Sequence, residues 1–359
     1  MDQSIAVDEK NLHQILVWMP HWLGDVVFAL LSVQALRVRF PHARITAVCH
    51  SPAHEILSNH PSIDSVIKIP FTPEDGWRPA FSFARSLKKY NFDLAVLFPN
   101  SFRSAVLSWL SGARIRIGYD TGGRGFLLTH AIPVRRDSKS VHATEYYSEV
   151  ISCLGIDQVA NDFQPVLTPE EVAQQGEWLE RQGVYPKDIV MAIQPGASKP
   201  EKRWHAERFG ILCQKLIKEY DAKILLLGST AEKELIAQVE KFCPREHSLT
   251  FIGKDLQAVL ALLRNCRLLI ANDSGLMHLA AMVGTPVVGI FGPGSPKTTD
   301  PCIDSSKKEI VSLNFSCSPC RHKFFKECEP SPHHKPFCIE NISVKDVSEA
   351  VGRLLEKIQ

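Results

Sequence analysis

The chain has 359 residues, a length that predicts two domains or one large one. Hydrophobic residues make up 45% and charged residues 22%, which is typical of a globular protein and argues against disorder, collagen or a solenoid. The 41 Lys and Arg nearly balance the 39 Asp and Glu, so charge gives no case for a nucleic-acid-binding protein. We expect no membrane span, because no apolar run reaches about 18 residues, and no secretory signal, because the N-terminus has no apolar stretch.

The first part of the chain alternates short apolar runs with helical patterns. Such alternation is typical of an open parallel sheet with helices on both faces. The apolar runs predict strands over residues 15–19, 44–49, 65–69, 93–98 and 114–118. The helical patterns cover residues 26–40, 78–90 and 101–111.

The alternation breaks around residues 155–169 and then restarts. Thr168-Pro169-Glu170-Glu171 has the pattern of a helix start, with proline at the first helical position and acids in the first turn. We therefore expect an N-terminal domain over residues 1–165 and a C-terminal domain over 166–359. Later strands are predicted over residues 189–194, 223–227, 249–252, 268–271 and 286–290, and helices over 206–220, 232–242, 256–265, 275–283 and 344–358.

This pattern predicts an α/β fold with two doubly wound domains and a central cleft. In such sheets ligands bind at the carboxyl ends of strands. No GxGxxG follows a strand and no GxxxxGK[ST] is present, which disfavours a dinucleotide cofactor and a P-loop. No Asp-x-Asp is present either, so the charge of a bound diphosphate must be met by groups other than a metal clamp of that type.

The strongest local motif is Asn272–Ala281, which follows a predicted strand and opens a helix. Small residues at such a turn allow backbone N–H groups to approach an anion, and the helix dipole favours a phosphate there. The alternative is that Asp273 or Ser274 simply caps the helix. The following Gly284–Pro293 run, a second strand that leads to a Gly/Pro loop, favours the phosphate interpretation.

Polar residues also follow two other predicted strands of the second half. Ser198, Lys202 and Arg203 could neutralise a leaving diphosphate, or they could form a solvated basic loop. Glu232 could accept two ribose hydroxyls, or it could be an ordinary first-turn acid of a helix.

In the N-terminal half, Asp25 follows the first predicted strand and is either a general base or a helix cap. A helix N-terminus makes a carboxylate a weaker base, and burial in a closed cleft offsets this effect. Cations are also frequent in this half and suit an anionic acceptor, although ordinary solvated charge is the alternative for each of them. They are Arg103, Arg114, Arg116, Arg124, Arg135, Arg136, Lys139 and His142.

Ten cysteines fall into two groups. Six are single residues in or near apolar segments and are predicted to be small core residues: Cys49, Cys153, Cys213, Cys243, Cys266 and Cys302. The other four are clustered, with His322, His333 and His334 between them: Cys317, Cys320, Cys328 and Cys338. This cluster is either a structural zinc site or a set of free thiols that can form a disulfide on oxidation, and its outer spacings fit no common zinc module.

Several of these motifs resemble the ADP-heptose:lipopolysaccharide heptosyltransferases, glycosyltransferase family 9, over nearly the whole chain. The resemblance is carried by Leu23-Gly24-Asp25, Lys202-Arg203-Trp204, Gly228–Glu232, Asn272–Ala281 and the Gly-Thr-Pro-Val-Val-Gly-Ile-Phe-Gly-Pro run. Pro99–Ser104 and Cys317-Ser318-Pro319-Cys320 are most similar to heptosyltransferase II. The segment Arg321–Phe337 is longer and more basic than the family leads us to expect.

The resemblance implies a GT-B fold of two Rossmann-like domains. The first domain would bind the acceptor and the second the ADP-sugar. The C-terminal helix is a candidate to pack back on the first domain. It implies inverting transfer without a metal or other cofactor. Asp25 would be the base and Lys202 the catalytic cation. The donor would contact Ser198, Lys202, Glu232, Asp273, Ser274, Gly275, Leu276 and His278. Among the cations of the first half, we expect Arg103, Arg124 and His142 to contact the acceptor.

The expected function is transfer of heptose from ADP-L-glycero-D-manno-heptose to heptosyl-Kdo2-lipid A, the second heptose of the lipopolysaccharide inner core. Heptosyltransferase I or III, a sugar-nucleotide epimerase and a non-catalytic nucleotide-sugar binder remain alternatives. Because ADP-sugars are cytosolic and the acceptor is lipid-linked, we expect a cytoplasmic protein peripheral to the inner membrane. Exposed cations would assist this contact by about 1 kcal/mol each. No nucleic acid is expected as a partner.

Overall fold

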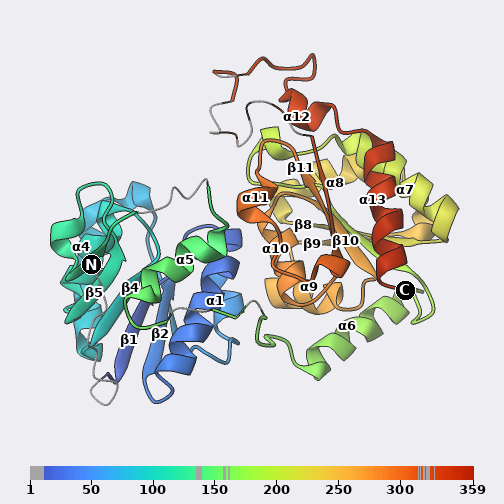
Figure 1. Cartoon of the computed structure of the whole chain (residues 1–359). Coiled ribbons are helices and arrows are strands. Elements are labelled where there is room, and N and C mark those ends of the chain that lie inside the picture. The colour runs from blue at the N-terminus through green and yellow to red at the C-terminus, as the bar shows by residue number, and fades with distance from the viewer. Residues whose placement is uncertain are drawn as a thin grey trace. The chain divides into compact units, whose positions relative to one another are not determined.

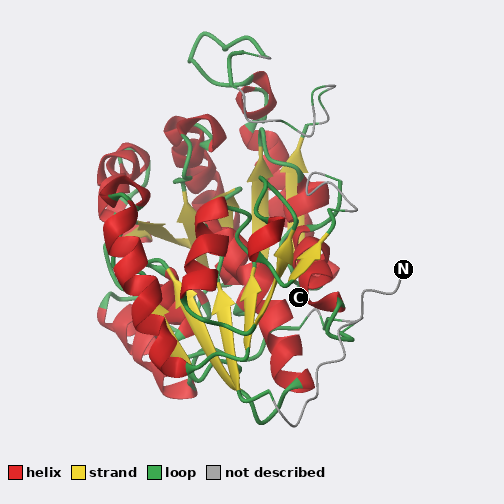
Figure 2. Cartoon of the chain, turned by 90° about the vertical axis from the view of Figure 1, so that its left-hand side faces the viewer, coloured by secondary structure: helices red, strands yellow, loops and turns green. Residues whose placement is uncertain are grey.

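The computed structural model describes residues 12–134, 140–156, 159–160, 162–313, 315, 317, 320, 324–326 and 328–359. The chain divides into two compact units, Met1–Val166 and Leu167–Gln359. Each unit has helices on both faces of a six-stranded sheet (Figures 1 and 2). The predicted α/β, doubly wound fold is therefore confirmed for both units.

The first unit contains a parallel sheet in the order β3-β2-β1-β4-β5-β6. Its strands are β1 Gln14–Trp18, β2 Arg44–Cys49, β3 Ser65–Lys68, β4 Leu94–Leu97, β5 Ile115–Tyr119 and β6 His130–Ile132. Its helices are α1 Leu23–Arg39, α2 Ala53–Leu57, α3 Trp77–Ser86, α4 Phe102–Leu110 and α5 Ala143–Ser152. Helices α1 and α5 pack together (Figure 1), and α3 packs against α4.

The second unit repeats this topology, with the order β12-β11-β10-β7-β8-β9. Its strands are β7 Val190–Gln194, β8 Lys223–Gly228, β9 Ser248–Ile252, β10 Leu268–Asn272, β11 Val287–Phe291 and β12 Lys308–Ser312. Its helices are α6 Pro169–Arg181, α7 Ala206–Tyr220, α8 Lys233–Glu240, α9 Leu256–Leu263, α10 Gly275–Met282, α11 Pro296–Thr299, α12 Phe337–Glu340 and α13 Val344–Lys357.

Central strands form where apolar residues run without interruption. Strands β4, β7, β10 and β11 are buried along their whole length, as expected for parallel strands covered on both faces. The first helix of the second unit begins at a capping box, in which the Thr168 hydroxyl accepts from the Glu171 N–H and the Glu171 carboxylate accepts from the Thr168 N–H. Each unit thus has its own sheet and its own apolar core.

The C-terminal helix α13 has one apolar face, formed by Val347, Val351 and Leu354. This face packs against α7, β11 and β12, so its core contacts lie in the second unit. No helix among the described residues is long and apolar enough to cross a membrane.

Candidate functional site

The carboxyl ends of β7 and β10 meet at the point where the strand order of the second unit reverses. The two strands are hydrogen-bonded neighbours, with Gln194 beside Ala271. In doubly wound sheets the loops at such a reversal diverge and leave a crevice for ligands. Most of the predicted donor-binding residues follow these two strands.

Lys202 and Asp273 form a buried ion pair at this point. The Lys202 Nζ lies 2.6 Å from Asp273 Oδ2, and the side chains are 15% and 8% exposed. The His278 Nε2 lies 3.9 Å from the other carboxylate oxygen, and that imidazole is also buried. The alternative of a solvated basic loop is therefore wrong for Lys202, whose ammonium is held in a fixed place by a carboxylate 71 residues away.

The first turn of α10 is not capped by a side chain. Ser274 stands at the N-cap position, but its hydroxyl donates to Gln194 Oε1 at 2.9 Å instead of accepting from the helix. The capping interpretation is therefore wrong for Ser274. Gly275 and Leu276 are half-buried in the first turn, where backbone N–H groups suit an anion.

Two amide side chains to which the sequence analysis assigned no role hold these loops in place. The buried Asn272 accepts from the Trp204 N–H at 2.9 Å and donates to the Pro195 carbonyl at 2.8 Å. Gln194, also buried, accepts from Ser274. The signal that could have revealed them is an amide side chain at the last position of a buried strand.

The loop after β7 is closed on itself. Arg203 Nε donates to the Ala197 carbonyl at 2.9 Å, so this arginine fixes the loop. Ser198 lies exposed within the loop, where a hydroxyl can reach a ligand.

Glu232 takes part in a capping box at the start of a helix. This fits the interpretation of Glu232 as an ordinary first-turn acid. Its Oε2 accepts from the Ser229 N–H at 2.9 Å and from the Ser229 hydroxyl at 2.8 Å. Its other oxygen, Oε1, lies so close to Gly196 that a Cβ at this glycine would overlap it. The carboxylate therefore lies beside the β7 loop as well as at the start of a helix.

In the first unit, Asp25 lies in the first turn of α1 and contacts Tyr147. The N-cap residue of α1 is Trp22, so Asp25 is not the helix cap. The Tyr147 hydroxyl is hydrogen-bonded to the Asp25 carboxylate; burial raises the pKa of Tyr147 and the neighbouring carboxylate raises it further. The tyrosine is thus a neutral phenol that donates to Asp25. It comes from α5, a helix not predicted from the sequence.

The predicted acceptor residues Arg103 and His142 lie in defined surroundings. The guanidinium of Arg103 lies 5.0 Å from the Phe71 ring and 5.2 Å from the Trp77 ring and donates to the Gly76 carbonyl. His142 is the N-cap of α5 and accepts from the Thr144 N–H at 3.3 Å. Three other predicted cations, Arg135, Arg136 and Lys139, lie outside the described residues.

Arg124 does not fit its predicted role in direct acceptor contact. It is fully buried, and burial lowers its pKa to about 10. Its guanidinium donates to the Pro99, Ser101 and Tyr119 carbonyls, the Ser104 hydroxyl and the Asn100 side chain. Arg124 therefore fixes the loop after β4, because its donors are used within the first unit.

Two histidines near the ends of β1 and β2 were also missed. The rings of His21 and His50 lie 4.9 Å apart and edge to face. Burial, His21 and Arg103 lower the pKa of His50, which favours a neutral imidazole there. His21 and His50 therefore add donor and acceptor groups near those of Arg103.

The four clustered cysteines lie near one another and are not paired in disulfides. Burial raises the pKa of Cys338 to about 12, and Cys320, Cys317 and Cys328 contribute to this shift. Their intervening residues Ser318, Pro319, Arg321 and His322 lie outside the described residues. Of the cysteines predicted as core residues, five are buried: Cys49, Cys153, Cys213, Cys243 and Cys266.

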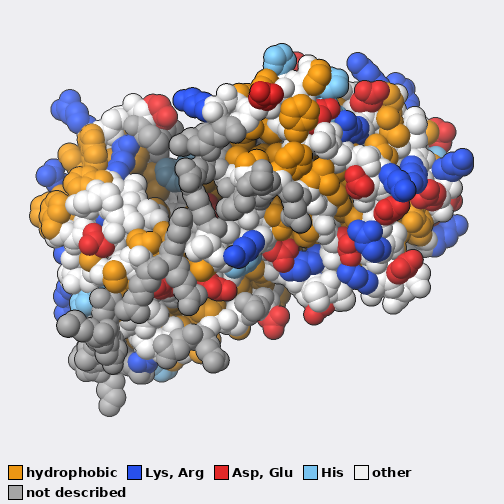
Figure 3. Space-filling model, turned by 45° about the horizontal axis from the view of Figure 1, so that its top comes forward, with side chains coloured by type: hydrophobic (Ala, Val, Ile, Leu, Met, Phe, Trp, Pro, Cys, Tyr) orange, Lys and Arg blue, Asp and Glu red, His pale blue; other side chains and the backbone are white. Residues whose placement is uncertain are grey.

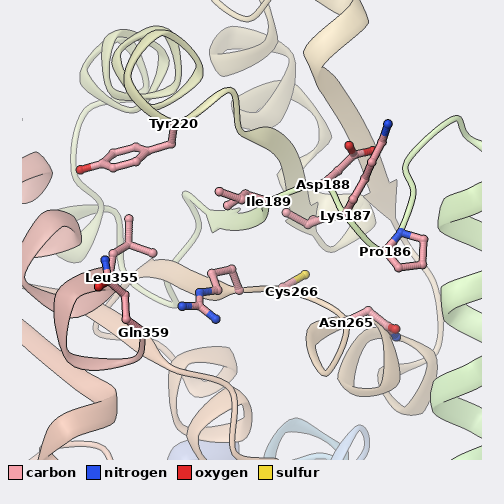
Figure 4. Close-up of a pocket in the computed structure, with 11 residues that line it drawn as sticks. Pro186, Lys187, Asp188, Ile189, Tyr220, Asn265, Cys266, Leu355 and Gln359 are labelled. Carbon is pink, nitrogen blue, oxygen red and sulfur yellow. The ribbon is translucent and has the colours of Figure 1, made fainter.

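Hollows elsewhere on the units do not coincide with these residues. A pocket of about 500 Å³ lies at the opposite, amino ends of β7 and β10, between Ile189, Arg267 and Leu355 (Figure 4). A second one, of about 950 Å³, lies in the first unit beside α1. Because ligands bind doubly wound sheets at their carboxyl ends, the candidate site is the β7–β10 region.

Comparison with known proteins decides the family. The model of glycosyltransferase family 9 (heptosyltransferase) matches residues 80–329, more than half of the chain. The chain belongs to this family. It is thus a glycosyltransferase, and the resemblance seen in the sequence is confirmed.

Relatives of this glycosyltransferase agree with the family match. Lipooligosaccharide heptosyltransferase 2 of Haemophilus influenzae is 28% identical over 314 residues, which cover 83% of this chain and 88% of the relative. The structure of Escherichia coli ADP-heptose heptosyltransferase II is 25% identical, with a TM-score of 0.77 over 96% of this chain and 99% of that one. A family 9 glycosyltransferase from Veillonella parvula, 24% identical, has the same GT-B fold, with a TM-score of 0.83 over 99% of both chains.

Proposed function

We propose that this enzyme transfers heptose from ADP-L-glycero-D-manno-heptose to a lipid A-linked core oligosaccharide, as the second heptose of the lipopolysaccharide inner core. The observation that supports it most is the buried Lys202–Asp273 pair at the strand-order reversal of the second unit. The family match and the heptosyltransferase II relatives support the choice of donor and acceptor.

The donor binds in the second unit. Lys202 and the N–H groups of Gly275 and Leu276 hold the diphosphate, with the exposed Ser198 hydroxyl as a further donor. Glu232 accepts the ribose hydroxyls through Oε1, since its Oε2 is used by Ser229. Ser274, Asp273 and His278 line the end at which the heptose is attached.

The chemistry is a single displacement with inversion. Asp25 takes the proton of the acceptor hydroxyl while that oxygen bonds to the anomeric carbon of heptose. The bond from this carbon to the β-phosphate oxygen breaks, and its electron pair leaves with ADP. Tyr147 orients the Asp25 carboxylate through its hydrogen bond.

Lys202 and the α10 N-terminus act where charge develops. Negative charge grows on the departing diphosphate, so fixed positive groups stabilise the transition state more than the ground state. We propose that these groups replace a metal ion and that no other cofactor takes part. The acceptor, an anionic glycolipid, is held in the first unit by Arg103 and His142, with Arg124 acting through the loop that it fixes.

We further propose that the enzyme works peripherally at the cytoplasmic face of the inner membrane. Exposed aromatic side chains on α3, α4 and the turn after β5 support this proposal. They are Trp77, Phe102, Trp109 and Phe126, which are 42%, 43%, 53% and 77% exposed. Hydrophobic side chains reach the surface of the first unit in Figure 3 (left). Aromatic side chains and cations such as Lys88 and Lys89 suit an anionic lipid surface.

The test is ADP release from ADP-L-glycero-D-manno-heptose in EDTA with two acceptors, Kdo2-lipid A and its mono-heptosylated form. We expect turnover only with the heptosylated acceptor. Turnover with the bare Kdo acceptor would indicate heptosyltransferase I. Conversion of the donor sugar without an acceptor would indicate an epimerase, and donor binding without any product a non-catalytic binder.

A further inference from the structure

The cysteine-rich segment, defined here by the described residues 324–326 and 328–340, lies against the loop that carries Lys202. The Lys335 Nζ donates to the Arg203 carbonyl at 2.8 Å and to the Pro200 carbonyl at 3.2 Å. The ammonium of Lys199 lies 5.4 Å from the centre of the Phe324 ring. The segment therefore contacts this loop on both sides of Lys202.

Glu340, at the end of this segment, is a buried centre of hydrogen bonds. Its carboxylate accepts from His205 Nε2 at 2.8 Å, Ser331 Oγ at 3.0 Å, His333 Nδ1 at 3.1 Å and Arg208 Nη2 at 3.3 Å. Burial alone would raise its pKa, but the hydrogen bonds outweigh burial and hold the pKa of Glu340 below its ordinary value. One carboxylate thus joins the segment to the residues that follow Lys202.

The helix that carries Glu340 also contacts the loop on the other side of the ion pair. A Cβ at Gly292, just after β11, would lie 2.6 Å from Ile339 Cβ. Two residues later, a Cβ at Gly294 would overlap the Asp273 carboxylate. Helix α12 therefore packs against the loop beside Asp273 and, through Glu340, holds the loop that carries Lys202.

We propose that Glu340 is a positioning residue that fixes Lys202 for the donor diphosphate. The inference rests on the proposed function, because it takes the β7 loop as the phosphate site. Glu340 does not touch the donor; it acts through His205 and Arg208. A small displacement of a catalytic cation is costly, since its effect depends on where the leaving charge develops.

The same residues could instead hold a cation, because His205, His333 and Glu340 place their ligand atoms within 4.8 Å of one another. The hydrogen bonds argue against this interpretation. Arg208 and Ser331, which are not among these ligands, already donate to the two oxygens of the Glu340 carboxylate. The cations Arg208 and Lys335 also lie beside this group and would repel a divalent ion.

The experiment compares Glu340→Gln with a matched control, Glu309→Gln. Glu309 is buried to a similar extent, 13% against 11% exposed, and pairs with Arg353 and Lys357, away from the donor loops. We expect Glu340→Gln to raise the ADP Kd and the donor KM about tenfold, as for loss of a charge-assisted hydrogen bond. Glu309→Gln should leave both constants within about twofold.

Amide hydrogen exchange of residues 195–205 gives a readout that does not need activity. It should become faster in Glu340→Gln than in Glu309→Gln. If Glu340→Gln folds poorly, Lys335→Met removes two other contacts of the same segment and should also raise the ADP Kd. A lower kcat with unchanged KM, ADP Kd and exchange would overturn the proposal, since a smaller folded fraction explains that result.

Two outcomes separate this proposal from the proposed function. In the first, the wild-type enzyme gives no product, but amide exchange of residues 195–205 is faster in Glu340→Gln and not in Glu309→Gln. The positioning role of Glu340 would then stand and the proposed function would be wrong. In the second, the wild-type enzyme holds one equivalent of zinc, which Glu340→Gln and His333→Ala lose and Cys317→Ser keeps. Glu340 would then be a metal ligand, and the proposal would be overturned.

Discussion

The two units use one strand order but build different surroundings at the point where it reverses. In the second unit, the residues after β7 and β10 are joined by buried contacts, the Lys202–Asp273 pair and the Asn272 side-chain bonds. In the first unit, Asp25 after β1 has a tyrosine partner, and Arg103 after β4 lies among aromatic rings.

This difference matches what each unit is proposed to bind. A diphosphate is small and highly charged, so a site for it gains from cations held rigidly before the ligand arrives. A glycolipid is large and partly apolar, and aromatic side chains with exposed faces suit it. The common sheet sets where each site lies, and the loops and added segments set its chemistry.

The largest expected effect tests the first unit. Asp25→Asn should lower turnover about 10³-fold, because it removes the proposed base while keeping the shape of the side chain. Steady-state ADP release with the heptosylated acceptor measures it. Tyr147→Phe, which removes only the hydrogen bond that orients the Asp25 carboxylate, is the control and should lower turnover far less. Turnover of Asp25→Asn within tenfold of the wild type would contradict the assignment.

The next prediction tests the second unit. Lys202→Ala should lower kcat about 10²-fold at saturating donor, through loss of charge stabilisation of the leaving group. It should also destabilise this unit by about 3 kcal/mol, because it leaves the buried Asp273 carboxylate unpaired. Adding Asp273→Asn should restore most of the stability but not the turnover. Recovery of both would make the pair purely structural.

A pH experiment distinguishes the units by stability. His60, buried in the first unit, has its pKa lowered by burial from 6.5 to about 4. The folded unit therefore favours the neutral imidazole. Above pH 6.5 His60 is neutral in both the folded and the unfolded chain. As the pH falls from 6.5 toward 4, the unfolded chain takes up a proton that the folded unit does not, and the free energy of unfolding decreases. Between pH 7 and 5 the loss is about 2 kcal/mol.

Amide hydrogen exchange of β1 and β2 at the two pH values measures this loss. His60→Gln should remove most of it, whereas the exposed His42→Gln should not. An equal pH dependence in all three proteins would show that His60 does not titrate as its burial requires.

The smallest expected effect concerns the lipid surface. Trp109→Ser together with Phe126→Ser should weaken binding to vesicles of anionic phospholipid about tenfold, since both side chains are largely exposed and large. Co-sedimentation measures it, and Tyr185→Ser, an exposed aromatic change in the second unit, is the control. An equal loss of vesicle binding in Tyr185→Ser would contradict the proposal that the exposed aromatic side chains of the first unit contact the membrane.

Long apolar runs made much of the fold predictable. Strand β2 and helix α7 have the bounds predicted from the sequence, 44–49 and 206–220. Strand β12 was missed because Lys308 and Glu309 interrupt its apolar pattern, as is common at a sheet edge. Helix α5 was missed because its polar residues hide the face that packs on α1.

The candidate site was predictable only as separate residues. Motifs pointed to Lys202 and Asp273, but their pairing across 71 positions needed the fold. Glu340, 135 positions from His205, carries no local signal. Arg124 was assigned to the acceptor from its charge, and sequence cannot tell an exposed guanidinium from one that is buried among carbonyls.

The most direct test of the division between the units is the affinity for ADP. Calorimetric titration would compare wild type, Asp25→Asn and the double variant Lys202→Ala, Asp273→Asn. We predict that Asp25→Asn binds ADP as the wild type does, while the double variant binds it at least about tenfold more weakly. Weaker ADP binding by Asp25→Asn, or unchanged binding by the double variant, would contradict the assignment of the donor to the second unit.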